Sequence, residues 1–97
     1  NNLDTNWSLI LDSTYKNKDK IKLLFDSGLG GEIYYVINSQ LKDIQDVNEY
    51  YYVSLWNGII FQTLISWSLH DFKDSIEYLT ELIKNYTKPI YNYKHNK

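Results

Sequence analysis

The feature that most limits how this chain can fold is a long apolar segment, EYYYVSLWNGIIFQTLISWSL, over residues 49–69. Projected as a helix at about 100° per residue, the segment has apolar side chains on nearly every side. A helix that is apolar all round must be covered all round. A chain of 97 residues has few other elements to cover it. Either the rest of the domain surrounds this helix, or a second molecule covers part of it.

The projection separates two apolar arcs. The predicted core arc contains Val53, Trp56, Ile60, Leu64 and Trp67. The arc on roughly the opposite side contains Tyr51, Ser54, Gly58, Phe61, Ile65 and Leu69. A glycine inside a helix costs about 1 kcal/mol relative to alanine, so a close helix neighbour is expected at Gly58. The second arc is therefore the predicted contact with another helix.

The other segments also predict helices, over about residues 4–15, 18–25, 32–44 and 75–86. Residues 33–37 also have the β-branched and aromatic composition of a strand, but the apolar stripe continues past them at helical spacing. The expected N-caps are Asp4, Asn17, either Asp46 or Asn48, and Ser75, and Pro89 is expected to end the last helix. The prediction is one all-α domain over residues 1–97, a bundle of about five helices.

Composition excludes several classes of protein. The net charge is −2 and the sequence contains no arginine, which argues against a nucleic-acid surface in this chain. There is no cysteine, so disulfides and thiolate sites are excluded. No signal peptide is visible, and the longest apolar run is shorter than the ~20 residues of a membrane span. Because the chain contains no methionine and begins Asn-Asn-Leu-Asp, we expect a processed or truncated piece of a protein. We also expect a cytoplasmic location and no membrane contact.

No catalytic or metal-binding pattern is found. The two histidines, His70 and His95, have no partner at metal-ligand spacing. The glycines at 28, 30 and 31 lack the lysine and hydroxyl residues of a phosphate loop, so they predict a turn. No nucleophile-elbow motif is present. We therefore expect no enzyme activity, no catalytic residues, no metal and no cofactor.

Three motifs in order carry a resemblance to a known family. These are the run from Tyr50 to Ile60 with its Gly-Ile-Ile segment, the pair Ser66-Trp67, and the Ser-opened helix from Lys73 to Ile83. Together they resemble the C-terminal regulatory domain of TetR-family transcriptional repressors. The likeness covers about residues 7–86. Upstream of the three motifs it includes Asn17 and the Ser27-Gly28 turn.

The resemblance implies a homodimer in which the last two helices of each copy form a four-helix bundle. The implied interface is the second arc, Tyr51, Ser54, Gly58, Phe61, Ile65 and Leu69, together with Leu79 and Ile83 of the last helix. The family reads DNA through an N-terminal helix-turn-helix, which these 97 residues lack, so DNA contact is expected only through a missing N-terminal domain.

The resemblance also implies that a small-molecule effector binds inside each subunit. The candidate ligand-binding residues are Tyr34, Tyr35, Tyr52, Trp56, Gln62 and Thr63, aromatic walls with a few polar groups. The alternative interpretation of each of these aromatic residues is that it packs in the hydrophobic core and contacts no ligand. The alternative function is a free-standing helical protein–protein interaction module, such as an antitoxin-like or immunity-like protein, whose partner covers the second arc.

Overall fold

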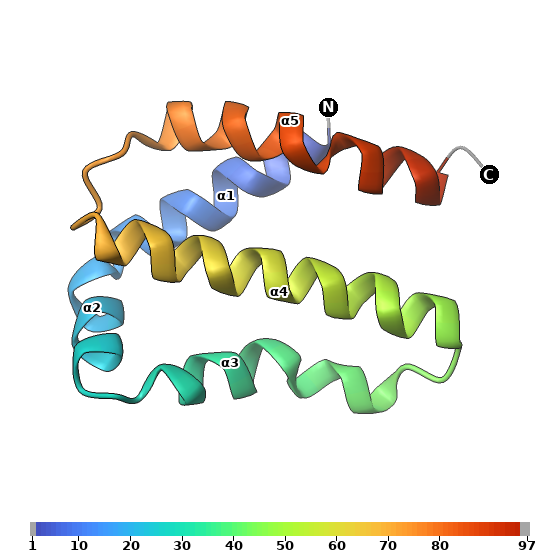
Figure 1. The fold of residues 1–97 in the computed structure, drawn as a ribbon, viewed down its shortest axis with the longest axis horizontal. Helices are drawn as coiled ribbons and strands as arrows, with labels where there is room; N and C mark the ends of the chain where they lie inside the picture. Colours follow the sequence, from blue (N-terminus) through green and yellow to red (C-terminus); the bar gives the residue numbers. More distant parts are fainter. Residues whose placement is uncertain (1, 96–97) are drawn as a thin grey trace.

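The computed structural model describes the backbone of residues 2–95 and the side chains of residues 6–95, and this part of the chain is helical (Figure 1). It contains no strand, so the all-α prediction is confirmed and the strand alternative for residues 33–37 is wrong. The elements are α1 (Asn2–Lys16), α2 (Lys18–Asp26), α3 (Gly30–Asn38), a 3₁₀ helix η1 (Ser39–Asp43), α4 (Val47–Leu69) and α5 (Ile76–His95).

The helices form a thin slab with α4 at its centre (Figure 1). The slab measures 40 × 30 × 16 Å. Helix α3 runs along one side of α4 and α5 along the other, α1 packs against α5, and α2 lies at the end where α4 turns into α5. A helix with its side chains is about 10–12 Å across, so a slab this thin leaves part of α4 uncovered. No described helix combines the length and the apolar character needed to cross a bilayer.

Two predicted helix caps are confirmed. The Asp46 carboxylate accepts a hydrogen bond from the backbone amide of Glu49 at 2.9 Å at the start of α4. The Ser75 hydroxyl accepts one from the amide of Tyr78 at 3.1 Å at the start of α5. Each bond satisfies an amide that has no partner within its own helix.

Other predicted boundaries are wrong. Helix α1 begins at Asn2, so Asp4 lies inside it. Asn17 precedes α2, but its side chain donates back to the Ser13 carbonyl at 2.9 Å and makes no cap. The expected third helix ends early at Asn38, where the Asn57 amide donates to the Ile37 carbonyl at 3.1 Å and thereby satisfies a carbonyl at the helix end.

The expected end of the last helix at Pro89 is also wrong, because α5 continues to His95 with Pro89 inside it. Two contacts to α4 hold the added turns. Lys94 forms an ion pair with Glu49. The His95 ring lies 6.4 Å from the Tyr52 ring, centroid to centroid. Tertiary contacts therefore outweigh the local effect of the proline.

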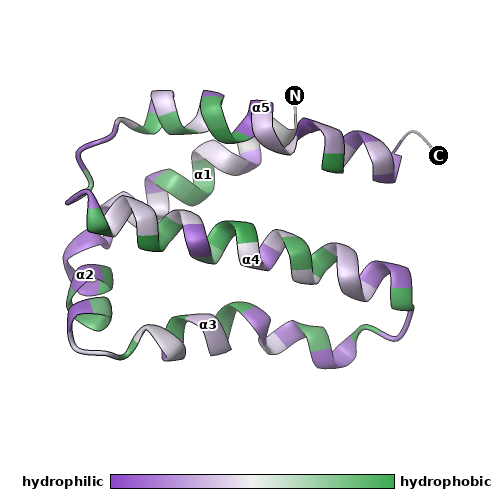
Figure 2. Ribbon diagram, viewed as in Figure 1, coloured by the Kyte–Doolittle hydropathy of each residue, from purple (hydrophilic) through white to green (hydrophobic). Residues whose placement is uncertain are grey.

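The compact core lies where α4 turns into α5. Leu11, Trp67 and Phe72 are buried there, and half-buried side chains of α2 and α5 surround them. Asp71 and Phe72, which form the turn, both have left-handed backbone, with φ of 56° and 57°. Hydrophobic residues recur along the whole of α4 but alternate with hydrophilic ones along α5 (Figure 2). Helix α4 is therefore the element whose burial decides the fold.

Candidate functional site

One broad surface of the slab is apolar and uncovered, and we call it the α4–α5 face. Trp56 and Trp67 of α4 contact α1 through Trp7 and Tyr15, and the exposed side chains of α4 project from another side of the helix. The residues that define the face are Tyr51, Leu55, Gly58 and Leu69 of α4 with Tyr78, Tyr86 and Tyr93 of α5. Leu55 is 60% exposed and Leu69 is 77% exposed. Such large exposed apolar side chains, gathered on one surface, mark an interaction site.

Two hollows between α4 and α5 make this face concave. The larger, of about 740 Å³, is lined by Tyr51 and Leu55 of α4 and by Pro89 and Tyr93 of α5. The smaller, of about 340 Å³, is lined by Gln62 and Ser66 of α4 and by Tyr78 and Leu82 of α5. Because both hollows draw residues from both helices, α4 and α5 present a continuous surface.

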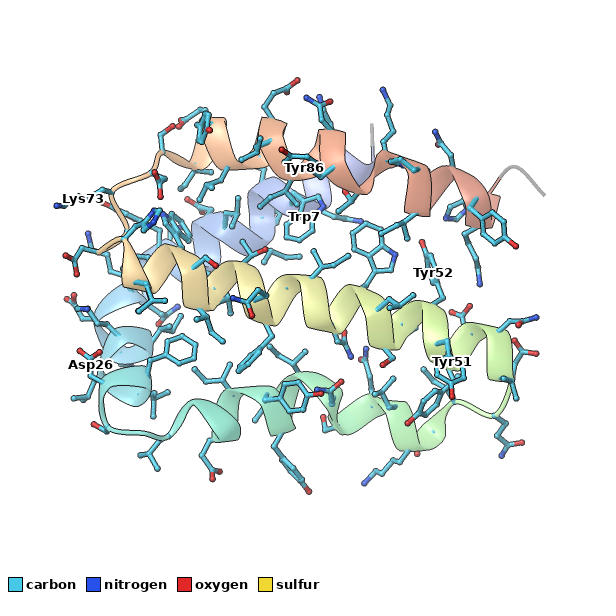
Figure 3. The ribbon with its side chains drawn as sticks, viewed as in Figure 1. Trp7, Asp26, Tyr51, Tyr52, Lys73 and Tyr86 are labelled. Atoms are coloured by element: carbon cyan, nitrogen blue, oxygen red, sulfur yellow. The ribbon has the colours of Figure 1, made fainter. Side chains whose placement is uncertain are left out.

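A third hollow of about 410 Å³ lies between α1, α4 and α5, and we call it the aromatic hollow. Figure 3 shows Trp7 and Tyr52 in the space between α4 and α5. The Trp7 and Trp56 ring centroids are 6.1 Å apart, and those of Tyr52 and Trp56 are 6.2 Å apart. The full lining is Asn6, Trp7, Ile10, Tyr52, Trp56, Ile60, Tyr91 and His95. Its volume and its aromatic walls are typical of small-molecule pockets.

Trp56, which lines this hollow, has an unusual indole N–H. The nitrogen is buried and has no hydrogen-bond partner in the part of the chain that the structure describes. A buried donor without an acceptor costs about 1–3 kcal/mol, so native proteins rarely contain one without a reason.

An ion pair joins α4 and α5 beside the aromatic hollow. Lys94 binds Glu49, and its ammonium lies 4.6 Å from the centroid of the Tyr52 ring. The hydrogen bond that the Lys94 ammonium donates to the Glu49 carboxylate raises the pKa of Lys94 and so favours its charged form. In the described part of the chain, no three acidic or histidine side chains gather closely enough to hold a metal ion.

The six candidate ligand-binding residues occupy three separate places. Only Tyr52 and Trp56 line the aromatic hollow. Gln62 and Thr63 line the smaller hollow of the α4–α5 face. Tyr34 lies on α3 with its ring 5.0 Å from that of Phe61, and Tyr35 on the same helix is 74% exposed. The sequence therefore identified two of the residues around the aromatic hollow.

The other lining residues were missed for identifiable reasons. Trp7 was read only as part of a helix face, and its contact with Trp56 joins residues far apart in the sequence. Tyr91 and His95 follow Pro89, where the helix was expected to have ended. Continuing the helical projection past Pro89 was the one available signal, since it places Tyr91 and His95 on the same side of α5.

The candidate dimer residues are also divided by the fold. Tyr51, Gly58 and Leu69 are exposed, whereas Ser54 and Ile65 are half-buried. Phe61 packs against Phe25 of α2 and Tyr34 of α3, so the same chain covers that part of the second arc. Leu79 and Ile83 pack against the core cluster. The homodimer itself stays a prediction.

Together these features define an all-helical domain with one uncovered apolar face and one aromatic hollow. Comparison of the chain with models of known protein families finds no match, and neither curated proteins nor solved structures match it.

Proposed function

We propose that this chain is the ligand-sensing and dimerisation domain of a TetR-like transcriptional regulator that acts in the cytoplasm. DNA binding would reside in a helix-turn-helix N-terminal to these 97 residues. The observation that carries the proposal is the uncovered apolar face formed by the last two helices. The aromatic hollow beside it is the proposed effector pocket.

The exposed area of the chain supports association. The chain exposes 6830 Å². A folded monomer of 11.6 kDa typically exposes about 5,800 Å². The excess exposed area is about 1,000 Å². Each partner in a stable interface of standard size buries a similar area, about 800 Å². Burying about 1,000 Å² in an interface would bring the chain to the exposure of an ordinary globular protein.

The geometry of the face suits a second copy of the same chain. Helices α4 and α5 run in opposite directions along the slab, so two such faces would pack as a four-helix bundle. A Cβ atom built on Gly58 would have no neighbour within 4 Å outside its own helix, so nothing in the described chain uses the missing side chain. A helix of the second copy could approach closely there, which would explain a glycine inside a helix.

The aromatic hollow lies beside the proposed interface. Tyr52 lines both the aromatic hollow and the larger hollow of the α4–α5 face. A molecule that moves Tyr52 would therefore change the surface that the second copy contacts. This shared side chain gives effector binding a direct physical route to the dimer.

Sedimentation velocity on charge-introducing variants tests the proposal. Leu55→Glu and Gly58→Glu each place a carboxylate in the proposed interface, where burying an unpaired charge is costly. We expect the dissociation constant of the dimer to rise by about 100-fold or more. Tyr35→Glu on the exposed side of α3 is the matched control and should leave the dimer unchanged.

Circular dichroism should show helical content in all three variants, because both interface positions are exposed in the single chain. A wild-type chain that sediments as a monomer at high micromolar concentration would refute the homodimer. An unchanged dimer in both interface variants would show that the α4–α5 face is not the contact.

A protein–protein interaction module is the second candidate. Tyr35 and Val36 of α3 are also exposed, and they lie outside the α4–α5 face. A monomeric wild-type chain would favour this reading, in which a different protein covers the apolar surface.

A further inference from the structure

Helices α4 and α5 present two rows of side chains with matching spacing on the α4–α5 face. The α4 row is Tyr51, Leu55, Gly58, Gln62, Ser66 and Leu69. The α5 row, written from the end of the helix backwards because α5 runs in the opposite direction, is Tyr93, Pro89, Tyr86, Leu82 and Tyr78. Steps of three and four residues keep each row on one side of its helix. The steps occur in the same order in both rows, so the two rows can be compared member by member.

The hollows of the α4–α5 face show which members of the two rows lie at the same level. The larger hollow is lined by the first two members of each row, and the smaller hollow by the fourth and fifth members of each row. The third members, Gly58 and Tyr86, therefore lie level with each other between the two hollows. Figure 3 shows Tyr86 on α5 level with the middle of α4.

Within one chain, the Tyr86 ring does not fill the space beside Gly58, which we call the Gly58 notch. A Cβ atom built on Gly58 would have no neighbour within 4 Å outside its own helix. Tyr86 is 76% exposed, although a tyrosine ring is a large apolar surface that gains from burial. Helix α5 packs mainly on α1. One chain therefore leaves an empty notch on α4 and an unburied ring on α5 at the same level.

A second copy would bring the notch and the ring together. A two-fold axis parallel to the helices places α5 of each copy on α4 of the other, antiparallel and with every row member at its own level. The Tyr86 ring then lies on the partner's Gly58, and symmetry makes this contact twice. The same pairing places Tyr78 on the partner's Ser66, the other small member of the α4 row. In both places a large ring meets a small residue.

A two-fold axis perpendicular to the helices, through the middle of the α4 row, gives a poorer fit. It places α4 on α4 of the partner, so Gly58 would face Gln62. The Tyr86 ring would face Leu82, and no ring would enter the notch. Because the side chains at a contact set the distance between two helices, large residues that face each other hold the helices apart.

We propose that the Tyr86 ring of each copy packs into the notch at the partner's Gly58, and that this reciprocal contact fixes the register of the dimer. This inference rests on the dimerisation part of the proposed function and names the pairing of helices in that same interface. The occupant of the face is a second copy, because the excess exposed area matches one standard interface per chain and neither row carries a charged residue that its own copy would repel.

Exchanging the sizes of the two side chains tests the contact. Gly58→Leu fills the notch and Tyr86→Ala removes the ring, and each should raise the dissociation constant of the dimer about tenfold or more in sedimentation velocity. The double variant Gly58→Leu/Tyr86→Ala places a leucine against an alanine. It should dimerise about tenfold more tightly than Gly58→Leu alone. Both positions are exposed in the single chain, so circular dichroism should show folded protein in every variant.

The matched control is Gly58→Leu/Tyr93→Ala. It removes a tyrosine of similar exposure, 71% against 76%, about two turns further along the α5 row. Because Tyr93 lies at the level of Tyr51 in the paired rows, its removal makes no room for the leucine. This control should therefore show no recovery over Gly58→Leu.

A disulfide test locates the contact directly. The chain contains no cysteine, so Gly58→Cys and Tyr86→Cys chains carry one thiol each. A disulfide requires Cα atoms within about 7 Å of each other. Oxidation of a mixture of the two chains should give a mixed disulfide, identified by its mass, whereas Gly58→Cys alone should not cross-link.

A disulfide in Gly58→Cys alone would place α4 on α4 of the partner and overturn the pairing. Absence of the mixed disulfide would overturn it as well. Equal recovery in the double variant and its control, or no recovery in either, would overturn the Tyr86–Gly58 contact while the dimer itself stands. A monomeric wild-type chain would refute the dimer of the proposed function, so the two failures are distinguishable.

Discussion

Trp56 and Trp67 lie about three helical turns apart on the same side of α4, but their surroundings differ. Trp67 is 2% exposed, packs against Phe72 at 5.2 Å between ring centroids, and donates to the Asp74 carbonyl. Trp56 is only half-buried, borders a hollow, and leaves its buried indole nitrogen without a partner in the described chain. One helix therefore supplies a structural tryptophan at one end and a candidate binding residue at the other.

The contrast extends to the helices around them. At the Trp67 end, α1 and the α4–α5 turn enclose the side chains completely, and Leu11 has no exposed area. At the Trp56 end, the Glu49–Lys94 ion pair and the contacts of the Tyr52 ring with His95 and Lys94 join α4 to α5. The closed end provides stability, and the open end leaves volume for a ligand.

The largest expected difference is in the free energy of unfolding of alanine variants at the two tryptophans. Trp67→Ala should lower it by about 3–5 kcal/mol, because it empties the enclosed core and removes a hydrogen bond. Trp56→Ala should lower it by about 1–2 kcal/mol, because less apolar area is buried there. Urea denaturation at equal protein concentration measures both. Equal losses would remove the distinction between the two ends.

A smaller effect is expected from Pro89→Ala at the open end. Pro89 lies inside α5 and cannot donate the amide hydrogen bond that the helix would otherwise make. The alanine restores that donor, and the free energy of unfolding should rise by about 1–3 kcal/mol. Lys88→Ala, its exposed neighbour, is the control and should change stability little. A loss of stability in Pro89→Ala would mean that the open end requires the break that Pro89 makes in the hydrogen-bond pattern of α5.

The smallest effect concerns the ion pair that joins α4 to α5. Glu49 raises the pKa of Lys94 above 10.5, so the stabilisation is present below that pH and is lost as pH rises through the raised pKa. Glu49→Gln should lower the pKa of Lys94 and reduce this alkaline loss of stability. NMR titration of the Lys94 side chain measures the change, with Glu77→Gln at the far end of α5 as control. A Lys94 pKa unaffected by Glu49→Gln would contradict the pairing.

Local rules predicted the helices because the signals lie within a few residues. Asp46 and Ser75 cap α4 and α5 as expected, since each cap depends only on the residues directly after it. The long helix ends at Leu69 as expected. The apolar periodicity was sufficient to predict an all-helical bundle.

Contacts between distant residues could not be predicted in this way. Phe61 was placed on a free arc, but Phe25 and Tyr34 cover it, and helical projection contains no information about which neighbour reaches which arc. The part of α5 past Pro89 contacts α4 through an ion pair with Glu49, a residue far away in the sequence. The aromatic hollow was only partly predicted for the same reason, since it draws its walls from three helices.

The turn between α4 and α5 has a consequence for how this chain can vary. Phe72 has a left-handed backbone, which glycine adopts most easily, but its ring is buried against Trp67. Glycine at this position would relieve the backbone and empty the core, whereas a β-branched residue would fill space and increase the strain. Position 72 should therefore tolerate very few amino acids, and related sequences that keep this helical hairpin should be recognisable by an aromatic residue where a glycine would be expected.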